Sequence, residues 1–276
     1  MTVDQSYAWA ERVARSQAKN FYYSFLLLKK PKRRAMCAIY AFMRYCDDLS
    51  DADGIGDRAA AIARWREDLE RALAGSAPDH PLWPAFTDAV GRYKIPHQYF
   101  FEMIDGVSSD LLPRVIETFD ELYGYCYRVA SVVGLTIIHI FGFSDPRALE
   151  LAEKCGIAFQ LTNILRDVRE DFEKGRVYIP AEDFTKFGVS AANFEPRKAF
   201  RDLLEFEARR ARKYYQESAP LIDLIDPASR SSLRALIAIY SRLLDRIVSS
   251  SYDVLSHRVR VPGWEKAWTL LRSAIL

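Results

Sequence analysis

The sequence FQLTNILRDVRED, residues 159–171, combines apolar residues with oxygen-bearing side chains at helical spacing. Asn163, Asp167 and Asp171 recur every fourth residue within this apolar run. Because residues four apart lie one above another on a helix, these three side chains share one face. The stretch therefore predicts a helix with an acidic face inside an apolar environment.

A second acidic cluster lies upstream in DDLSD, residues 47–51. Asp47 and Asp51 are again four apart, and Asp48 adds a third carboxylate. Like charges at this spacing cost a helix about 0.2–0.5 kcal/mol per pair, so compensation by cations is expected. Clusters of oxygen ligands without His or Cys suit Mg²⁺, which takes one or two carboxylates and completes its shell with waters and phosphates. We therefore expect two half-sites that face each other across a cavity.

The amino-acid composition indicates a globular protein and argues against several classes of partner. The 276 residues are 50% hydrophobic, enough for a sizeable core. The net charge of +2 and the lack of a long basic stripe argue against nucleic acid as a partner. Four cysteines form no CxxC pair and no secretory leader precedes them, so we expect free thiols and a cytoplasmic protein.

The fold class follows from periodicity. The sequence shows no strand alternation, no repeat of 20 to 50 residues and no Gly/Ser-rich linker. We predict one all-α domain, residues 1–276, with about ten helices around a central cavity. Expected boundaries include a cap at Asp4, a helix from Pro31 to Asp51, a cap at Asp57 and a start at Thr118 or Asp120. The apolar run 129–143 is shorter than the ~20 residues that span a bilayer, so it predicts a buried core helix.

Three motifs carry a resemblance to a known family. They are DDLSD at 47–51, YCYRVASVVG at 125–134, and QLTNILRDVRED at 160–171 continuing into FEKGRVYIP at 172–180. Together they resemble the squalene and phytoene synthases, which join two prenyl diphosphates head to head. The resemblance runs from about Ser16 to about Val261. It implies an isoprenoid-synthase-type helical bundle and an Mg²⁺-dependent prenyl transferase, with Mn²⁺ as the alternative metal.

The resemblance also implies roles for individual residues. The implied metal ligands are Asp47, Asp51, Asn163, Asp167 and Asp171, and the implied catalytic groups are the four aspartates and Tyr125. The implied substrate contacts are Phe21, Tyr40, Arg44, Gln160, Asn163, Arg166, Tyr178 and Tyr252, and Arg258 matches a basic residue near the pocket. Asp167→Asn is then expected to abolish turnover while leaving thermal stability equal or higher, because it removes a repulsive charge.

Several residues keep a second interpretation. Arg44 lies three residues before Asp47, so it either pairs with that carboxylate or binds diphosphate. The acidic residues Glu102, Asp105 and Asp110 are interpreted as a solvated helix face. FYYSF at 21–25 fits a core strand or a helix end, and EKGRVYIPAEDF at 173–184 is interpreted as a loop.

Arg128 stands where phytoene synthases usually carry a small or aromatic residue, so the segment looks closest to bacterial presqualene diphosphate synthases. This implies condensation of two farnesyl diphosphates in squalene and hopanoid biosynthesis, with release of presqualene diphosphate to a downstream squalene-forming enzyme. NADPH is then not expected. The alternatives are a complete NADPH-dependent squalene synthase, a dehydrosqualene- or phytoene-type synthase, and a non-catalytic helical scaffold. Because such substrates are oily, peripheral contact with the inner membrane face stays open.

Overall fold

The computed structural model describes residues 1–276 apart from 19–20, 52–56, 77, 112–114, 193–197 and 276, and the side chains of Phe21 and Asp51 also lie outside the described part. The described residues contain helices, two isolated β-bridges and no strand, which confirms the all-α prediction. In chain order the elements are α1 (Val3–Gln17), α2 (Phe21–Phe25), α3 (Lys30–Asp51), α4 (Arg58–Leu73), α5 (Trp83–Tyr93), α6 (Gln98–Ser109), α7 (Phe119–Cys126), the π-helical turn η1 (Tyr127–Ser131), α8 (Val132–Phe141), α9 (Arg147–Glu173), α10 (Ala181–Phe187), α11 (Lys198–Ser218), α12 (Leu221–Leu224), α13 (Pro227–Ser249) and α14 (Gly263–Ile275).

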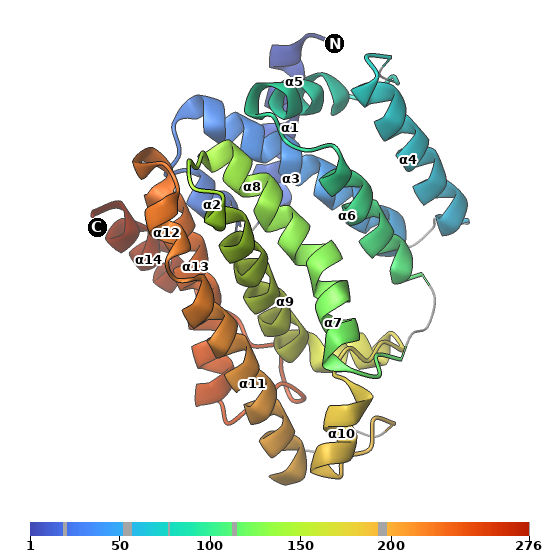
Figure 1. Ribbon diagram of the computed structural model, residues 1–276, viewed down its shortest axis with the longest axis vertical. Coiled ribbons are helices and arrows are strands. Elements are labelled where there is room, and N and C mark those ends of the chain that lie inside the picture. The colour runs from blue at the N-terminus through green and yellow to red at the C-terminus, as the bar shows by residue number, and fades with distance from the viewer. Residues whose placement is uncertain (19–20, 52–56, 77, 112–114, 193–197, 276) are drawn as a thin grey trace.

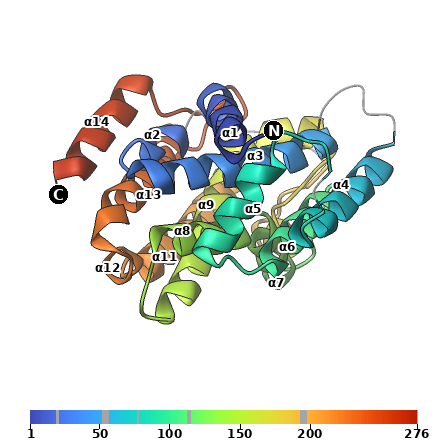
Figure 2. The same cartoon turned by 90° about the horizontal axis from the view of Figure 1, so that it is seen from above.

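The long helix α9 lies in the middle of the bundle (Figure 1). It packs against α8, η1, α11 and α13, while α3 packs against α1, α5, α6 and α8. Figure 2 shows the same arrangement from above, with α14 at the edge beside α2 and α13. Helix α8 thus contacts both α3 and α9, the two helices that carry the acidic clusters.

Most helix starts lie where the sequence places them. Asp57 caps α4 by accepting the Ala60 N–H at 2.9 Å, and Thr118 caps α7. The prediction for α1 is wrong, because Thr2 and not Asp4 is the cap, in a reciprocal pair with Gln5. A capping box with Gln at the third position satisfies two backbone donors at once, which favours this start.

Of two short helices, one decides an alternative that the sequence left open and the other was not predicted. FYYSF forms α2, a helix of 5 residues. The segment interpreted as a loop contains the start of α10, which opens after Pro180 with Glu182 and Asp183 in its first turn. Acidic residues in the first turn complement the helix dipole and favour a helix that starts here. The sequence interpretation missed this start because Gly175, shortly before it, suggested a loop.

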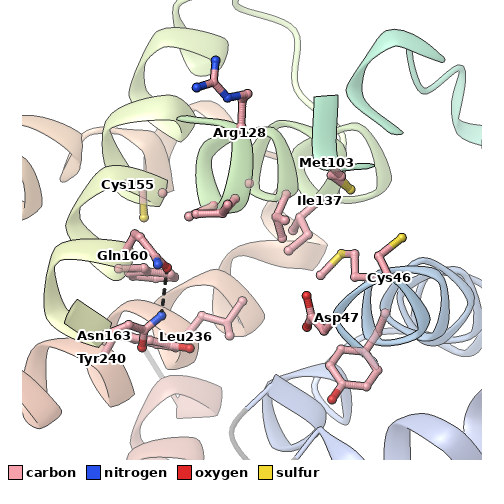
Figure 3. Close-up of a pocket in the computed structure, with 18 of the residues that line it drawn as sticks. Cys46, Asp47, Met103, Arg128, Ile137, Cys155, Gln160, Asn163, Leu236 and Tyr240 are labelled. Atoms are coloured by element: carbon pink, nitrogen blue, oxygen red, sulfur yellow. Dashed lines mark hydrogen bonds between the residues drawn. The ribbon is translucent and has the colours of Figure 1, made fainter. Parts of the chain in front are cut away.

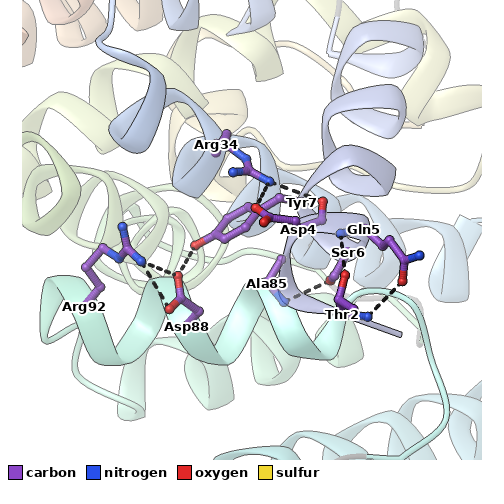
Figure 4. A network of polar contacts seen from close by, with 9 residues as sticks. All are labelled: Thr2, Asp4, Gln5, Ser6, Tyr7, Arg34, Ala85, Asp88 and Arg92. Atoms are coloured by element: carbon purple, nitrogen blue, oxygen red, sulfur yellow. Dashed lines mark hydrogen bonds and ion pairs between the residues drawn. The ribbon is translucent and has the colours of Figure 1, made fainter.

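Helix α1 is fixed to the bundle by side-chain hydrogen bonds (Figure 4). The Ser6 hydroxyl accepts the Ala85 N–H at 2.9 Å, and the Tyr7 hydroxyl donates to Asp88 at 2.6 Å. Arg34 of α3 lies over the Tyr7 ring, 4.5 Å from its centroid. These contacts hold the first half of α1 against α5 and α3.

Close helix packing explains one glycine of α9. A Cβ at Gly156 would lie 2.5 Å from the Ser131 Cα, so only glycine lets α9 approach η1 this closely. The Ser131 hydroxyl donates to the Glu153 carbonyl at 2.7 Å across the same contact. Ala130 and Gly134 line a cavity, and a Cβ at Gly134 would also lie 3.1 Å from the Ala152 carbonyl oxygen of α9. The small residues therefore allow the helices to pack closely and also leave room for the cavity.

One helical run among the described residues, Phe119–Phe141, is long and apolar enough to cross a membrane by length and composition. It is longer than the expected apolar run because α7 and η1 continue directly into α8. Within it, 56% of the most apolar window is buried in the fold. Since it packs against α6 and α9, it is a core helix of the bundle.

Candidate active site

A cavity of about 510 Å³ lies between α3, α6, η1, α8, α9 and α13 (Figure 3). One part of its wall is polar and includes Tyr40, Arg44, Asp47, Gln160, Asn163 and Arg166. The remainder is largely aliphatic, with Val133, Ile137, Ile138, Leu233 and Leu236. The cavity is thus suited to a ligand with a charged head and an apolar tail.

The two acidic segments face the same space. Figure 3 shows Asp47 on α3 and Asn163 on α9 on opposite sides of the cavity, with both side chains directed into it. They are 116 positions apart in the sequence, so only the tertiary fold brings them together. Asp47 and Asn163 therefore lie opposite each other across the cavity, as expected for the two segments that carry them.

Two buried polar atoms of the cavity wall lack hydrogen-bond partners among the described residues. They are the Nε of Arg44, which is a donor, and the Oδ1 of Asn163, which is an acceptor. The Asn163 amide nitrogen donates to Gln160 at 3.2 Å, which orients its oxygen. Buried polar groups are nearly always satisfied, so an unpaired donor and acceptor in one cavity point to an anion and a cation as ligands.

Arg44 does not pair with Asp47 as the sequence allowed. Its guanidinium binds Asp48, one full turn along α3, because residues four apart lie on the same helix face. Both side chains are about two-fifths exposed. Asp47 therefore keeps its place on the cavity wall while Asp48 orients the arginine.

Asp167 lies one turn beyond Asn163 and is held by two arginines. Arg166 donates to it through Nε at 2.7 Å and Arg258 through Nε at 2.9 Å. Its side chain is only 16% exposed. The carboxylate is thus stabilised by fixed positive charge, and the repulsion inferred from the sequence is compensated within the protein.

Asp171 lies one turn further, in a small hollow with Arg176 and Tyr178. Burial, followed by the charge of Asp167, raises the pKa of Asp171 to about 7, although Arg176 opposes the shift. A nearby cation would stabilise the ionised form of this carboxyl group and lower its pKa. No group of three or more His, Cys, Asp or Glu in the described part of the chain could hold a metal alone. The oxygen donors fit Mg²⁺, which binds few carboxylates and shares its shell with phosphates.

A hydrogen-bonded cluster closes one side of the cavity. Tyr125 and Tyr178 both donate to Asp110, each at 3.0 Å, and their rings stack with centroids 4.8 Å apart. The Arg176 guanidinium also donates to the Asp110 carbonyl at 3.3 Å. Burial and the Asp110 charge raise the pKa of Tyr125 well above its usual value. Asp110, interpreted from the sequence as solvated, is therefore a cavity residue.

The remaining sequence-predicted residues divide into three groups. Tyr40, Gln160 and Arg166 line the cavity together with Arg44, Asp47, Asn163 and Tyr125. Tyr252 follows α13 with a φ of 61° and packs with the apolar cluster around α11, away from the described cavity wall. The side chains of Phe21 and Asp51 lie outside the described residues. Sequence reasoning missed Tyr240, which stacks on Phe159 at 4.3 Å beside Asn163.

Comparisons with known proteins agree with this geometry. A family model for squalene/phytoene synthase matches residues 14–265. A phytoene synthase of Arthrospira platensis is 35% identical, with 100% of this chain and 96% of the relative aligned. A phytoene synthase of Mycobacterium tuberculosis is 36% identical, with 96% of this chain and 89% of the relative aligned.

Solved structures give the same result. A dehydrosqualene synthase in complex with ligand superposes with a TM-score of 0.91 and 31% identity, covering 98% of this chain and 96% of that one. A squalene synthase from Alicyclobacillus acidocaldarius superposes with a TM-score of 0.85 and 27% identity, covering 91% and 95%. The chain therefore belongs to the squalene/phytoene synthase family, the prenyl transferases that join two prenyl diphosphates head to head.

Proposed function

We propose that this enzyme joins two farnesyl diphosphates by 1'-1 condensation into presqualene diphosphate, in squalene and hopanoid biosynthesis. One substrate loses its diphosphate, the other keeps it, and one proton is released on closure of the cyclopropane ring. The observation that carries the proposal is the two-part cavity, with unpaired atoms of Arg44 and Asn163 at its polar part and aliphatic walls beyond. A downstream enzyme would reduce the product to squalene.

The polar part supports ionisation of the first substrate. Arg44 and Arg166 can bind diphosphate oxygens and hold the leaving group as the carbon–oxygen bond breaks. Mg²⁺ or Mn²⁺, held by Asp47, Asn163, Asp167 and Asp171 with Asp51, would neutralise the charge of that leaving group when bound. The protein residues thus place positive charge where negative charge develops.

The rest of the cavity supports the cationic intermediate. Its aliphatic wall excludes water, which would convert an allylic cation to an alcohol. The aromatic residues Tyr40, on α3, and Phe159, on α9, also line the cavity, and aromatic rings can stabilise positive charge. At ring closure the Tyr125 oxygen accepts the released proton while its own proton passes to Asp110, to which it already donates.

Asp110→Asn tests this proton route. Asparagine has one acceptor oxygen in place of two, so one of the two tyrosine hydroxyls loses its partner and the side chain no longer takes up a proton. We expect kcat to fall by about tenfold or more, equivalent to ~1.4 kcal/mol in the barrier. Steady-state kinetics measures this. Tyr178→Phe leaves the Tyr125–Asp110 hydrogen bond in place, so its kcat should fall less. A wild-type kcat in Asp110→Asn would contradict the route.

A second candidate has support from the relatives. Those reported above at 35% and 36% identity are phytoene synthases, which favours geranylgeranyl diphosphate as substrate for the same condensation. Two solved structures above 25% identity are a dehydrosqualene and a squalene synthase, and Arg128 lines the cavity of this chain. These observations support farnesyl chains as the first choice.

Product analysis separates the candidates. Purified enzyme is incubated with Mg²⁺ and either farnesyl or geranylgeranyl diphosphate, with and without NADPH, and products are identified by mass. We expect presqualene diphosphate from farnesyl diphosphate in both tubes. Squalene formed only with NADPH would indicate a complete squalene synthase, and preference for geranylgeranyl diphosphate would indicate the phytoene type. No release of diphosphate from either substrate would contradict all three.

A further inference from the structure

The last helix, α14, exposes an apolar stripe. The described chain has ten exposed large hydrophobic side chains, and four of them lie on this helix. They are Trp264, Trp268, Leu271 and Ile275, with exposed fractions of 71, 66, 59 and 81%. Their spacing of four, three and four places them on one face. We call this face the α14 stripe.

The buried face of α14 is polar, which reverses the usual pattern of a surface helix. Glu265 is 7% exposed and Ser273 is 4% exposed. The carboxylate of Glu265 accepts from Arg242 at 2.8 Å and from Arg246 at 2.5 Å, both on α13. Ion pairs therefore hold the helix against the bundle, and its apolar residues are directed outward. A contiguous apolar stripe exposed on a soluble protein usually marks a surface that something apolar covers.

The charges near the stripe are basic. From Arg260 to Ile275 the charged residues are Arg260, Glu265, Lys266 and Arg272, and the single acid is neutralised by the two arginines of α13. Helix α2, which packs against α14, is followed by the exposed pair Lys29 and Lys30. An apolar stripe with two tryptophans and a basic surround has the composition of an interfacial membrane helix.

We propose that α14 docks this enzyme on an anionic lipid surface, with the α14 stripe inserted among the headgroups. Tryptophan is suited to this depth because its ring is apolar and its N–H is polar. The basic surround matches anionic headgroups, whereas a second copy of the chain would bring the same positive charge to the contact. Figure 2 shows α14 at the edge of the molecule, where a flat surface can reach it. This inference is independent of which prenyl diphosphate the enzyme uses.

The chain offers its own spectroscopic probe. Of its five tryptophans, Trp65 and Trp83 are buried and Trp9 is half-buried, so Trp264 and Trp268 are the ones that a lipid can reach. Purified full-length protein is mixed with vesicles of phosphatidylcholine alone or with phosphatidylglycerol, each with brominated acyl chains. We expect co-flotation and fluorescence quenching with the anionic vesicles, both weakened at high ionic strength.

Variants assign the contact to α14. Trp264→Ser/Trp268→Ser/Leu271→Ser should lower the bound fraction at least tenfold and abolish quenching. Val3→Ser/Val115→Ser, which changes exposed apolar residues elsewhere, should bind as wild type does. Turnover of substrate dispersed in detergent should be unchanged in both variants, so a failure of membrane binding does not depend on the proposed reaction.

Three results would overturn the proposal. Wild-type protein that neither floats with anionic vesicles nor shows quenching would exclude lipid as the occupant, and this arm requires no variant to fold. Equal binding of the triple variant would place the contact elsewhere. Sedimentation of a dimer that the triple variant converts to monomer would show that a second copy covers the α14 stripe.

Discussion

Asp47→Asn is expected to lower kcat by about 10²–10³-fold, the usual cost of removing one group that stabilises charge in a transition state. The substitution keeps the shape of the side chain but removes the negative charge that faces Asn163 across the cavity. A neutral amide binds a divalent cation more weakly, so the leaving diphosphate is less well neutralised. Diphosphate release under saturating substrate measures the effect.

A matched control is available on the exterior. Asp105 pairs with Arg66, and the two side chains are 50% and 40% exposed, so Asp105→Asn makes the same chemical change outside the cavity. It should retain wild-type turnover. Thermal unfolding of both variants should remain close to wild type, since both carboxylates are exposed. Wild-type kcat in Asp47→Asn would show that this carboxylate takes no part in ionisation.

Asp167→Asn is expected to reduce both turnover and stability. The sequence suggested equal or higher stability, but the carboxylate accepts from Arg166 and Arg258, and the Arg166 side chain is 15% exposed. Removing the charge leaves a largely buried guanidinium without its partner, which we expect to cost about 1–3 kcal/mol. Urea unfolding measures this as a lower midpoint.

Arg258→Gln serves as the comparison for this prediction. It removes only the outer partner, which is 41% exposed, so its effect on stability should be smaller than that of Asp167→Asn. If Asp167→Asn unfolds at or above the wild-type urea concentration, the arginine contacts contribute nothing to stability. The carboxylate would then be as repulsive as the sequence pattern suggests.

Helical periodicity predicted the elements of the fold but not their partners. The spacing in α9, the caps at Asp57 and Thr118, and the helix from Pro31 follow from local physics and are present. The opposition of Asp47 and Asn163 was expected only because two acidic faces need a shared cation. Where no such complementary pattern exists, the sequence carries no signal about which helices meet.

Asp110 illustrates that limit. In FFEMIDGVSSDL it follows the acidic residues Glu102 and Asp105, and Asp105 indeed pairs at the surface. What distinguishes Asp110 is Tyr178, which lies 68 residues downstream and is held near it where the start of α10 meets the segment that precedes α7. Here the backbone N–H of Ala181 donates to the Ile116 carbonyl at 2.8 Å. No local pattern encodes that contact.

Helix α14 shows the same limit for amphipathic helices. Its periodicity identifies a helix with one apolar face, and the ordinary expectation is that this face packs inward. The ion pairs of Glu265 with Arg242 and Arg246 reverse the orientation. Because those arginines lie on another helix, the direction of the apolar face becomes visible only in the folded chain.

The central claim is that the cavity between α3 and α9 binds a prenyl diphosphate together with a divalent cation. Calorimetric titration with a non-ionisable farnesyl thiodiphosphate tests it directly, with and without Mg²⁺, on wild type and Asp47→Asn. We predict tight binding only for wild type with Mg²⁺, and weak binding of Mg²⁺ alone. Equal affinity without Mg²⁺ or in Asp47→Asn, or tight binding of Mg²⁺ without the diphosphate, would contradict the account.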